Sequence, residues 1–193
     1  MPTNRIEAFS GGVIAVIITI MVLELKVPRD TTFTALLATA PQFLAYLLSF
    51  LVVAIMWVNH HHLLHAARHA DASLLWSNNN LLFWMSLVPF VTAYMGNNYR
   101  DPRAVAPYGA VLLLCSIAFS ILRNAISCHH RDDPSQVAYH RRALGKNLFS
   151  AALYAASIPL AFYDVRISFF IFAFVALSYF LPERKLAEPD THS

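Results

Sequence analysis

The sequence predicts an all-α integral membrane protein with six transmembrane helices, and three observations support that fold class. Hydrophobic residues make up 58% of the 193 residues and charged residues only 13%, whereas a soluble domain averages about 45–50% apolar and about 25% charged residues. The apolar residues are concentrated in six blocks separated by polar segments. The blocks do not alternate between apolar and polar residues, as the strands of a membrane barrel do.

Each block has the features of a helix. The first is a continuous stretch of Val, Ile and Leu behind a small-residue start, and about 20 such residues cross a bilayer. The second begins at Pro41, while Pro89 in the third and Pro159 in the fifth predict kinks. The sixth is short and ends before Pro182. The expected helices cover about 6–25, 41–59, 74–95, 104–128, 144–163 and 167–181.

These helices are expected to form one domain over residues 1–182, followed by a polar tail over 183–193. An even number of spans places both termini on one side of the membrane. Nine Lys and Arg residues fall on that side and five on the other, so the positive-inside rule predicts cytoplasmic termini. The formal net charge is only +3 and no long basic run is present, which makes membrane lipid, and not nucleic acid, the expected partner.

One face of the first helix is uncharged and almost wholly apolar. At 100° per residue, five of its side chains fall within an arc of about 100°. Such a face packs against another helix in most proteins, and in others it lines a path through the membrane. The five residues of this face are Gly12, Val16, Thr19, Ile20 and Leu23.

Ionisable residues lie near both ends of the first helix. Arg5 and Glu7 are near its inner end and Glu24 is near its outer end. Charged groups at membrane depth face protein or water and not lipid. A carboxylate repeated by symmetry around a pore concentrates cations at the pore mouth. Glu7 and Glu24 are therefore candidates for that role, and placement among lipid headgroups explains them equally well.

The end of the second helix is rich in histidine. His61, His65 and His69 recur every four residues and therefore share one helix face. Imidazoles at this spacing can bind Zn²⁺ or another transition metal. However, no Cys lies nearby and Asp71 is the only carboxylate close in sequence. A helix end that hydrogen-bonds its neighbours is the simpler interpretation, and no metal is assigned.

Nothing in the sequence indicates catalysis. The Gly-x-Ser-x-Gly, His-Glu-x-x-His and Walker A patterns are absent, so the chain is not expected to be an enzyme and no cofactor is assigned. The Thr-Val-Gly-Tyr-Gly pore loop that many potassium channels contain is also absent. A channel built from this chain would therefore select ions by something other than a cage of carbonyl oxygens.

Three motifs in register resemble the transmembrane protein 175 family of potassium channels, which is found in lysosomes and in many prokaryotes. The family's first helix begins Arg-x-x-x-Phe-Ser-Asp-Gly-Val and continues to a Thr and a closing acidic residue, matched here by Arg5, Phe9, Ser10, Gly12, Val13, Thr19 and Glu24. The second helix ends in Trp57-Val58-Asn59-His60-His61, similar to the family's Trp-x-Asn-His-His. The third helix also fits, and the later helices agree in number and length.

The resemblance implies a homotetramer of six-helix chains, in which four first helices line an hourglass pore and hydrophobic rings act as gate and filter. Carried over to this sequence, the constriction consists of Val16, Thr19, Ile20 and Leu23, which all belong to the face defined above. The resemblance further implies a packing network near the inner end of the pore helix, formed by Arg5, Phe9, Ser10 and Gly12 with Trp57 and His60 or His61 as partners.

The function that the resemblance implies is a potassium-permeable channel in the plasma membrane of a prokaryote, with K⁺ as the permeant ion. K⁺ holds its water less tightly than Na⁺, so a narrow apolar ring would favour K⁺ weakly to moderately. Gly11 stands where the family usually has Asp, and Val16 is smaller than the usual Ile or Leu. Two alternatives stay open: a metal-binding or metal-sensing membrane protein that uses the histidines, and a proton leak through the same pore.

Overall fold

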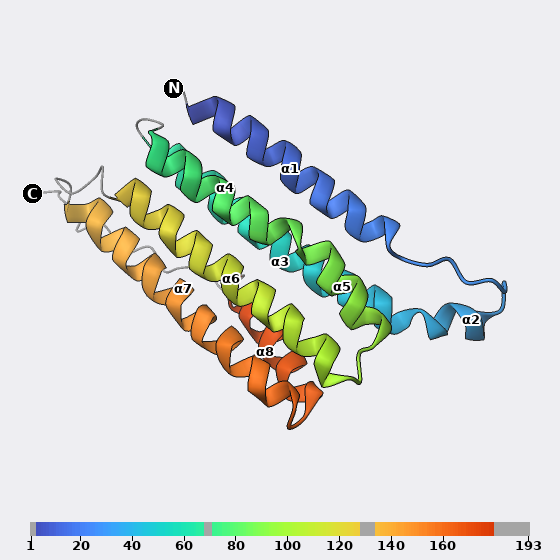
Figure 1. Cartoon of the computed structure of the whole chain (residues 1–193). Helices are drawn as coiled ribbons and strands as arrows, with labels where there is room; N and C mark the ends of the chain where they lie inside the picture. The colour runs from blue at the N-terminus through green and yellow to red at the C-terminus, as the bar shows by residue number, and fades with distance from the viewer. Residues whose placement is uncertain (1–2, 68–70, 128–133, 180–193) are drawn as a thin grey trace, which may run out of the picture.

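The computed structural model describes residues 3–67, 71–127 and 134–179, and the secondary structure in these ranges is entirely helical. The all-α class is therefore confirmed for the described residues. Figure 1 shows the long helices side by side, with α1 along one edge of the bundle and α7 along the opposite edge. The helices are α1 (Thr3–Leu23), α2 (Phe33–Ala38), α3 (Ala40–His65), α4 (Ala72–Ser86), α5 (Val88–Asn97), α6 (Pro102–Ser127), α7 (Pro134–Ala161) and α8 (Val165–Ser178).

Three of the described helices, α1, α3 and α6, are long and apolar enough to cross a membrane by themselves. In their most apolar stretches, 67% of the residues of α6 are buried within the chain, against 28% for α1 and 22% for α3. A helix that is apolar on all sides yet exposed within its own chain requires lipid or another protein around it. These helices identify a multi-pass membrane protein with α6 at its centre.

The segment 74–95, expected as one helix, is two helices separated at Leu87. Pro89 has no N–H to donate to the preceding turn, and the Leu87 N–H donates to the Trp84 carbonyl oxygen at 3.2 Å. The Val88 carbonyl oxygen accepts from Thr92 Oγ1 at 2.7 Å, so a side chain stabilises the first turn of α5. The kink expected at Pro89 is therefore a full interruption of the helix.

Three further helical segments differ from the expected ones, the first being α3, which ends at His65 and not at residue 59. The α7 helix begins at Pro134 and not at residue 144, so part of the segment expected as a loop is helical. The short α2 lies in the first connection, where Thr32 Oγ1 accepts from the Ala35 N–H at 3.3 Å and caps the helix. Pro159 lies inside α7, which continues to Ala161. The tail over 183–193 lies outside the described residues.

The α6 helix packs against α7, α4 and α8, and an aromatic pair lies at its contact with α8. Tyr108 and Phe172 are fully buried, and their rings meet edge to face with centroids 5.0 Å apart. The Tyr108 hydroxyl is also 3.0 Å from Ser49 Oγ on α3. Beside this cluster, a Cβ added at Gly109 would lie 2.6 Å from Ser157 Oγ. A larger residue at position 109 would therefore force the Ser157 side chain or one of the two helices to move.

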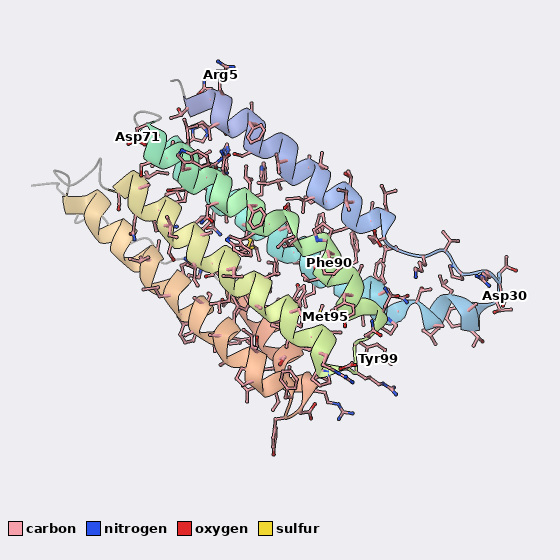
Figure 2. All side chains as sticks on the ribbon, viewed as in Figure 1. Arg5, Asp30, Asp71, Phe90, Met95 and Tyr99 are labelled. Atoms are coloured by element: carbon pink, nitrogen blue, oxygen red, sulfur yellow. The ribbon has the colours of Figure 1, made fainter. Side chains whose placement is uncertain are left out.

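The α1 helix packs on one side only, against α3, α4 and α5. Its buried residues recur every three or four positions and define the side that faces the bundle. Arg5, at the start of the helix, points away from the bundle (Figure 2). The buried residues of α1 are Ile6, Ser10, Ile14, Ile17 and Met21.

Candidate functional site

The apolar face predicted on α1 points away from the chain's own bundle. Val16 is 54% exposed, Ile20 42% and Leu23 81%, and Gly12 and Thr19 are also exposed. Thr19 Oγ1 donates its hydrogen bond to the Val16 carbonyl oxygen at 2.8 Å. This bond uses the hydroxyl hydrogen and leaves the oxygen lone pairs able to accept a hydrogen bond or coordinate a cation.

A buried polar network holds the opposite side of α1. Asn78 on α4 donates through Nδ2 to Ser10 Oγ at 3.0 Å, and its Oδ1 is 2.7 Å from His60 Nε2 on α3. Because the amide oxygen can only accept, His60 must carry hydrogen on Nε2. All three side chains are almost fully buried. The network therefore connects three helices and fixes the rotation of α1 about its axis.

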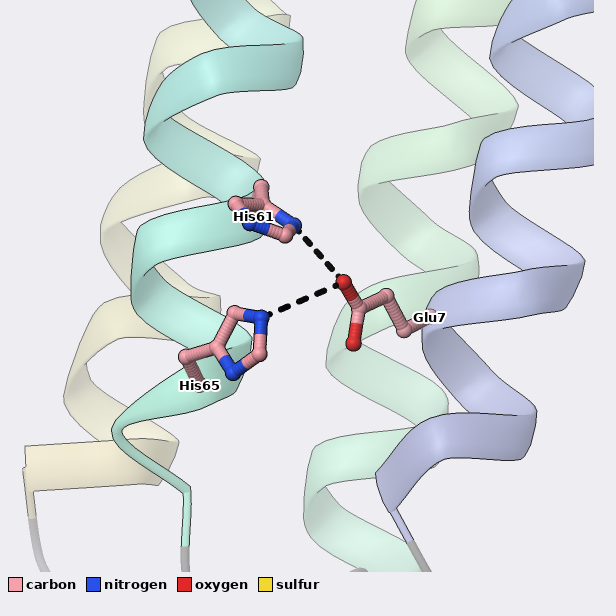
Figure 3. A group of neighbouring side chains, drawn as sticks. All are labelled: Glu7, His61 and His65. Atoms are coloured by element: carbon pink, nitrogen blue, oxygen red, sulfur yellow. Dashed lines mark ion pairs between the residues drawn. The ribbon is translucent and has the colours of Figure 1, made fainter.

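A second polar cluster lies at the same end of the bundle (Figure 3). Glu7 Oε1 is 2.6 Å from His61 Nδ1 and 3.5 Å from His65 Nε2. The two histidines are one helical turn apart on α3, with ring centroids separated by 4.4 Å. The Trp57 ring stacks against His61, one turn earlier, at 6.0 Å. Glu7 therefore points from α1 toward α3, away from the direction of Val16 and Leu23.

The remaining predicted site residues lie apart from these two clusters. Arg5 and Phe9 are exposed on α1, and Phe9 lines a shallow hollow with Gly12, Val16 and Ile20. Glu24 is exposed directly after the end of α1. Of the packing residues implied by the resemblance, the structure connects Ser10 with His60 through Asn78. His69 lies outside the described residues.

Sequence reasoning did not identify the specific partners in these clusters. Residues 78–80 are three consecutive asparagines, and nothing in the sequence distinguishes the one that bonds to other helices. In the structure Asn78 is 1% exposed, whereas Asn79 is exposed. No spacing signal connects Glu7 to the histidines, because these residues belong to different helices.

Several known proteins are similar to this chain along most of its length. The family model described as "Endosomal/lysosomal potassium channel TMEM175" matches residues 5–89. A potassium channel from Chryseobacterium sp. (strain P1-3) is 40% identical over 187 residues, covering 96% of each chain. A potassium channel from Streptomyces collinus is 33% identical over 203 residues, covering 97% of this chain and 98% of that protein. The human endosomal/lysosomal proton channel TMEM175 is 32% identical over 112 residues, covering 52% of this chain and 22% of the human protein.

Solved structures agree with these matches. The lysosomal potassium-selective channel TMEM175 homolog from Chamaesiphon minutus superimposes with a TM-score of 0.81 at 30% sequence identity, covering 92% of this chain and 95% of that chain. A variant of the potassium channel MtTMEM175 has the same fold, with a TM-score of 0.64 at 17% identity, covering 91% of this chain and 88% of that chain. Because the match to the Chryseobacterium protein extends along nearly the whole of both chains, and the Chamaesiphon homolog shares the fold, this chain belongs to the TMEM175 family.

Proposed function

We propose that this chain forms a potassium-permeable channel, as a homotetramer in which α1 lines the pore. The observation that carries the proposal is the exposed apolar face of α1, where Val16, Ile20 and Leu23 point away from the chain's own bundle. The opposite face of the same helix is packed against α3, α4 and α5. Two curated relatives that match nearly the full chain are named potassium channels, which supports the permeant ion.

The proposed topology has six membrane crossings: α1, α3, α4 with α5, α6, α7 and α8. Both termini lie in the cytoplasm, as the distribution of Lys and Arg indicates, and the channel lies in the plasma membrane of a prokaryote. In this orientation Ser10 is near the inner end of the pore helix and Leu23 near its outer end. Glu24, exposed beyond Leu23, then stands at the outer pore mouth, where a ring of carboxylates attracts cations.

In the proposed pore, fourfold symmetry brings four copies of each exposed α1 side chain around one axis. Apolar rings at Val16, Ile20 and Leu23 close the pore by dewetting when they are narrow. A cation that passes such a ring must give up or exchange part of its water, which costs less for K⁺ than for Na⁺. The Thr19 oxygens supply some replacement ligands. The expected preference for K⁺ is about three- to thirtyfold, equivalent to about 0.7–2 kcal/mol.

The proposal is tested by ion flux into liposomes that contain the purified protein, with K⁺, Na⁺ and choline compared. The diagnostic variant is Leu23→Asn, because an amide ring holds water at the constriction and removes the penalty that separates K⁺ from Na⁺. The matched control is Leu177→Asn on α8, since Leu177 is also an exposed leucine, at 62%, and α8 packs against α3, α6 and α7. We expect the preference for K⁺ to be lost in the first variant and kept in the second.

Two results would contradict the proposal. If the wild-type protein passes Na⁺ as readily as K⁺, the apolar ring does not act as a filter. If no substitution along the exposed face of α1 changes the flux, α1 does not line the pore. Acidification of the vesicles without a K⁺ gradient would instead favour a proton leak, for which the human relative, named a proton channel, provides a comparison.

A further inference from the structure

We propose that Glu7, His61 and His65 form a binding site for a transition-metal dication such as Zn²⁺, which fastens the inner end of α1 to the end of α3. The three side chains come from two helices and converge on one point (Figure 3). Their ligand atoms all lie within 4.8 Å of one another. The structure thus places Glu7 beside His61 and His65.

The donor set suits a metal of borderline softness. Two imidazole nitrogens and one carboxylate oxygen form a set that Zn²⁺ and its neighbours in the first transition row bind, with water completing the coordination. The two histidines are four residues apart on one helix, the spacing at which neighbouring turns present two imidazoles to a single ion. The Trp57 ring stacked on His61 holds that imidazole in place and thereby reduces the entropy lost on binding.

Two of the three ligand-atom spacings are close to those that the ion requires, while the His61 and His65 ligand atoms lie within 4.8 Å of each other and must close by up to about 1.5 Å. Bonds of about 2.0–2.1 Å in a tetrahedral site separate the ligand atoms by about 3.3 Å. Glu7 Oε1 and His65 Nε2 are already 3.5 Å apart, and Glu7 Oε1 and His61 Nδ1 are 2.6 Å apart. The second pair must therefore open by about 0.7 Å, a movement within reach of the Glu7 side chain torsions.

Access and charge also favour a cation at this point. The side chains of Glu7, His61 and His65 are 30%, 41% and 62% exposed, so an ion can reach them from water. A hollow lined by Asn4, Glu7, Gly11, Trp57, His60 and His61 opens beside the cluster. His65 is the last residue of α3, where the carbonyl end of the helix carries partial negative charge. Glu7 supplies a full negative charge.

The test uses the purified full-length chain in detergent, stripped with a chelator and titrated with ZnCl₂ by calorimetry. We expect one Zn²⁺ per chain, and at least tenfold weaker binding in His61→Ala, His65→Ala and Glu7→Gln. The matched control is His62→Ala, which removes an exposed histidine of the same helix and should leave the affinity unchanged. Absence of stoichiometric binding to the wild type, or an equal loss in the control, would overturn the site.

A second measurement on the wild-type protein keeps the test decisive if a variant does not fold. The zinc X-ray absorption spectrum of the loaded protein should show nitrogen and oxygen ligands at about 2.0–2.1 Å, with outer-shell scattering from two imidazoles. A shell with fewer than two imidazoles would reject the assignment. The site does not depend on the proposed channel function: absent flux with intact Zn²⁺ binding rejects the channel alone, and intact flux without binding rejects the site alone.

Discussion

Replacing Asn78 by Ala tests whether the buried polar network holds α1 against the bundle. The substitution removes the amide that connects Ser10 on α1 with His60 on α3, at 3.0 Å and 2.7 Å. Ser10 is 0% exposed and His60 2%, so water does not readily replace the lost partner. The expected result is a less stable protein in which α1 detaches more easily.

The size of the effect follows from the two interhelical links that are lost. Hydrogen bonds between membrane helices contribute about 0.6 kcal/mol on average and up to about 1.7 kcal/mol. Two such links give about 1–3 kcal/mol, and the burial of both orphaned groups places the estimate near 2 kcal/mol. This corresponds to about a thirtyfold decrease in the ratio of folded to unfolded protein.

The assay is equilibrium unfolding in mixed micelles of increasing SDS content, at one fixed protein concentration because an oligomer's stability depends on it. Asn79→Ala is the matched control, since Asn79 is the neighbouring amide on the same helix and is exposed. A double-mutant cycle with Ser10→Ala then isolates the link from α4 to α1. If Asn78→Ala costs no more than Asn79→Ala, the network does not anchor the helix and the reasoning fails.

Two further predictions concern glycines. Gly109→Ala should lower the free energy of unfolding by about 1–3 kcal/mol through overpacking, because the new Cβ would lie 2.6 Å from Ser157 Oγ and 3.4 Å from the Phe172 ring. Gly145→Ala should instead raise the free energy of unfolding by up to about 1 kcal/mol, because its Cβ would meet nothing within 4 Å. Thermal melts in detergent compare the two variants. Gly11→Asp introduces the acid that is usual in the family, at a position where a Cβ also meets nothing within 4 Å. This variant should therefore have the same gel-filtration profile and melting temperature as the wild type. Aggregation on gel filtration would show that the position has no room for a carboxylate.

Spacing along the chain predicted which residues group together, but not what they face. Ile14 and Val16 are both β-branched and apolar, yet Ile14 is 2% exposed and Val16 54%. In water this contrast would be visible as a polar face on the helix, whereas a membrane accepts apolar residues on every side. The grouping of Val16 with Leu23 was therefore predictable from sequence, and the direction of that face was not.

Some features of the helices and the site follow from the local sequence, and others depend on how the helices pack together. A kink at Pro89 was expected because proline lacks the N–H that a helix interior needs, but the full interruption at Leu87 was not. Pro134, a residue favoured in the first helical turn, is consistent with the start of α7 at that position. The residues that follow it are polar, however, and polar residues do not indicate a membrane helix. The pairing of Glu7 with His61 is set by the packing of α1 on α3, which no local pattern encodes.

The α1 helix is held by different kinds of contact in its first turns and further along its length. The polar contacts described above come from Glu7 and Ser10 in its first turns, whereas the buried residues further along are Ile14, Ile17 and Met21. Apolar contacts have no preferred direction, so that half is held by burial, whereas the first turns are held by directional polar contacts. Leu23 lies about 20 Å from Ser10 along the axis, and a tilt of about 5° at that pivot displaces it by about 1.7 Å. Any tilt at the anchored end would therefore move Leu23 further than it moves Ser10.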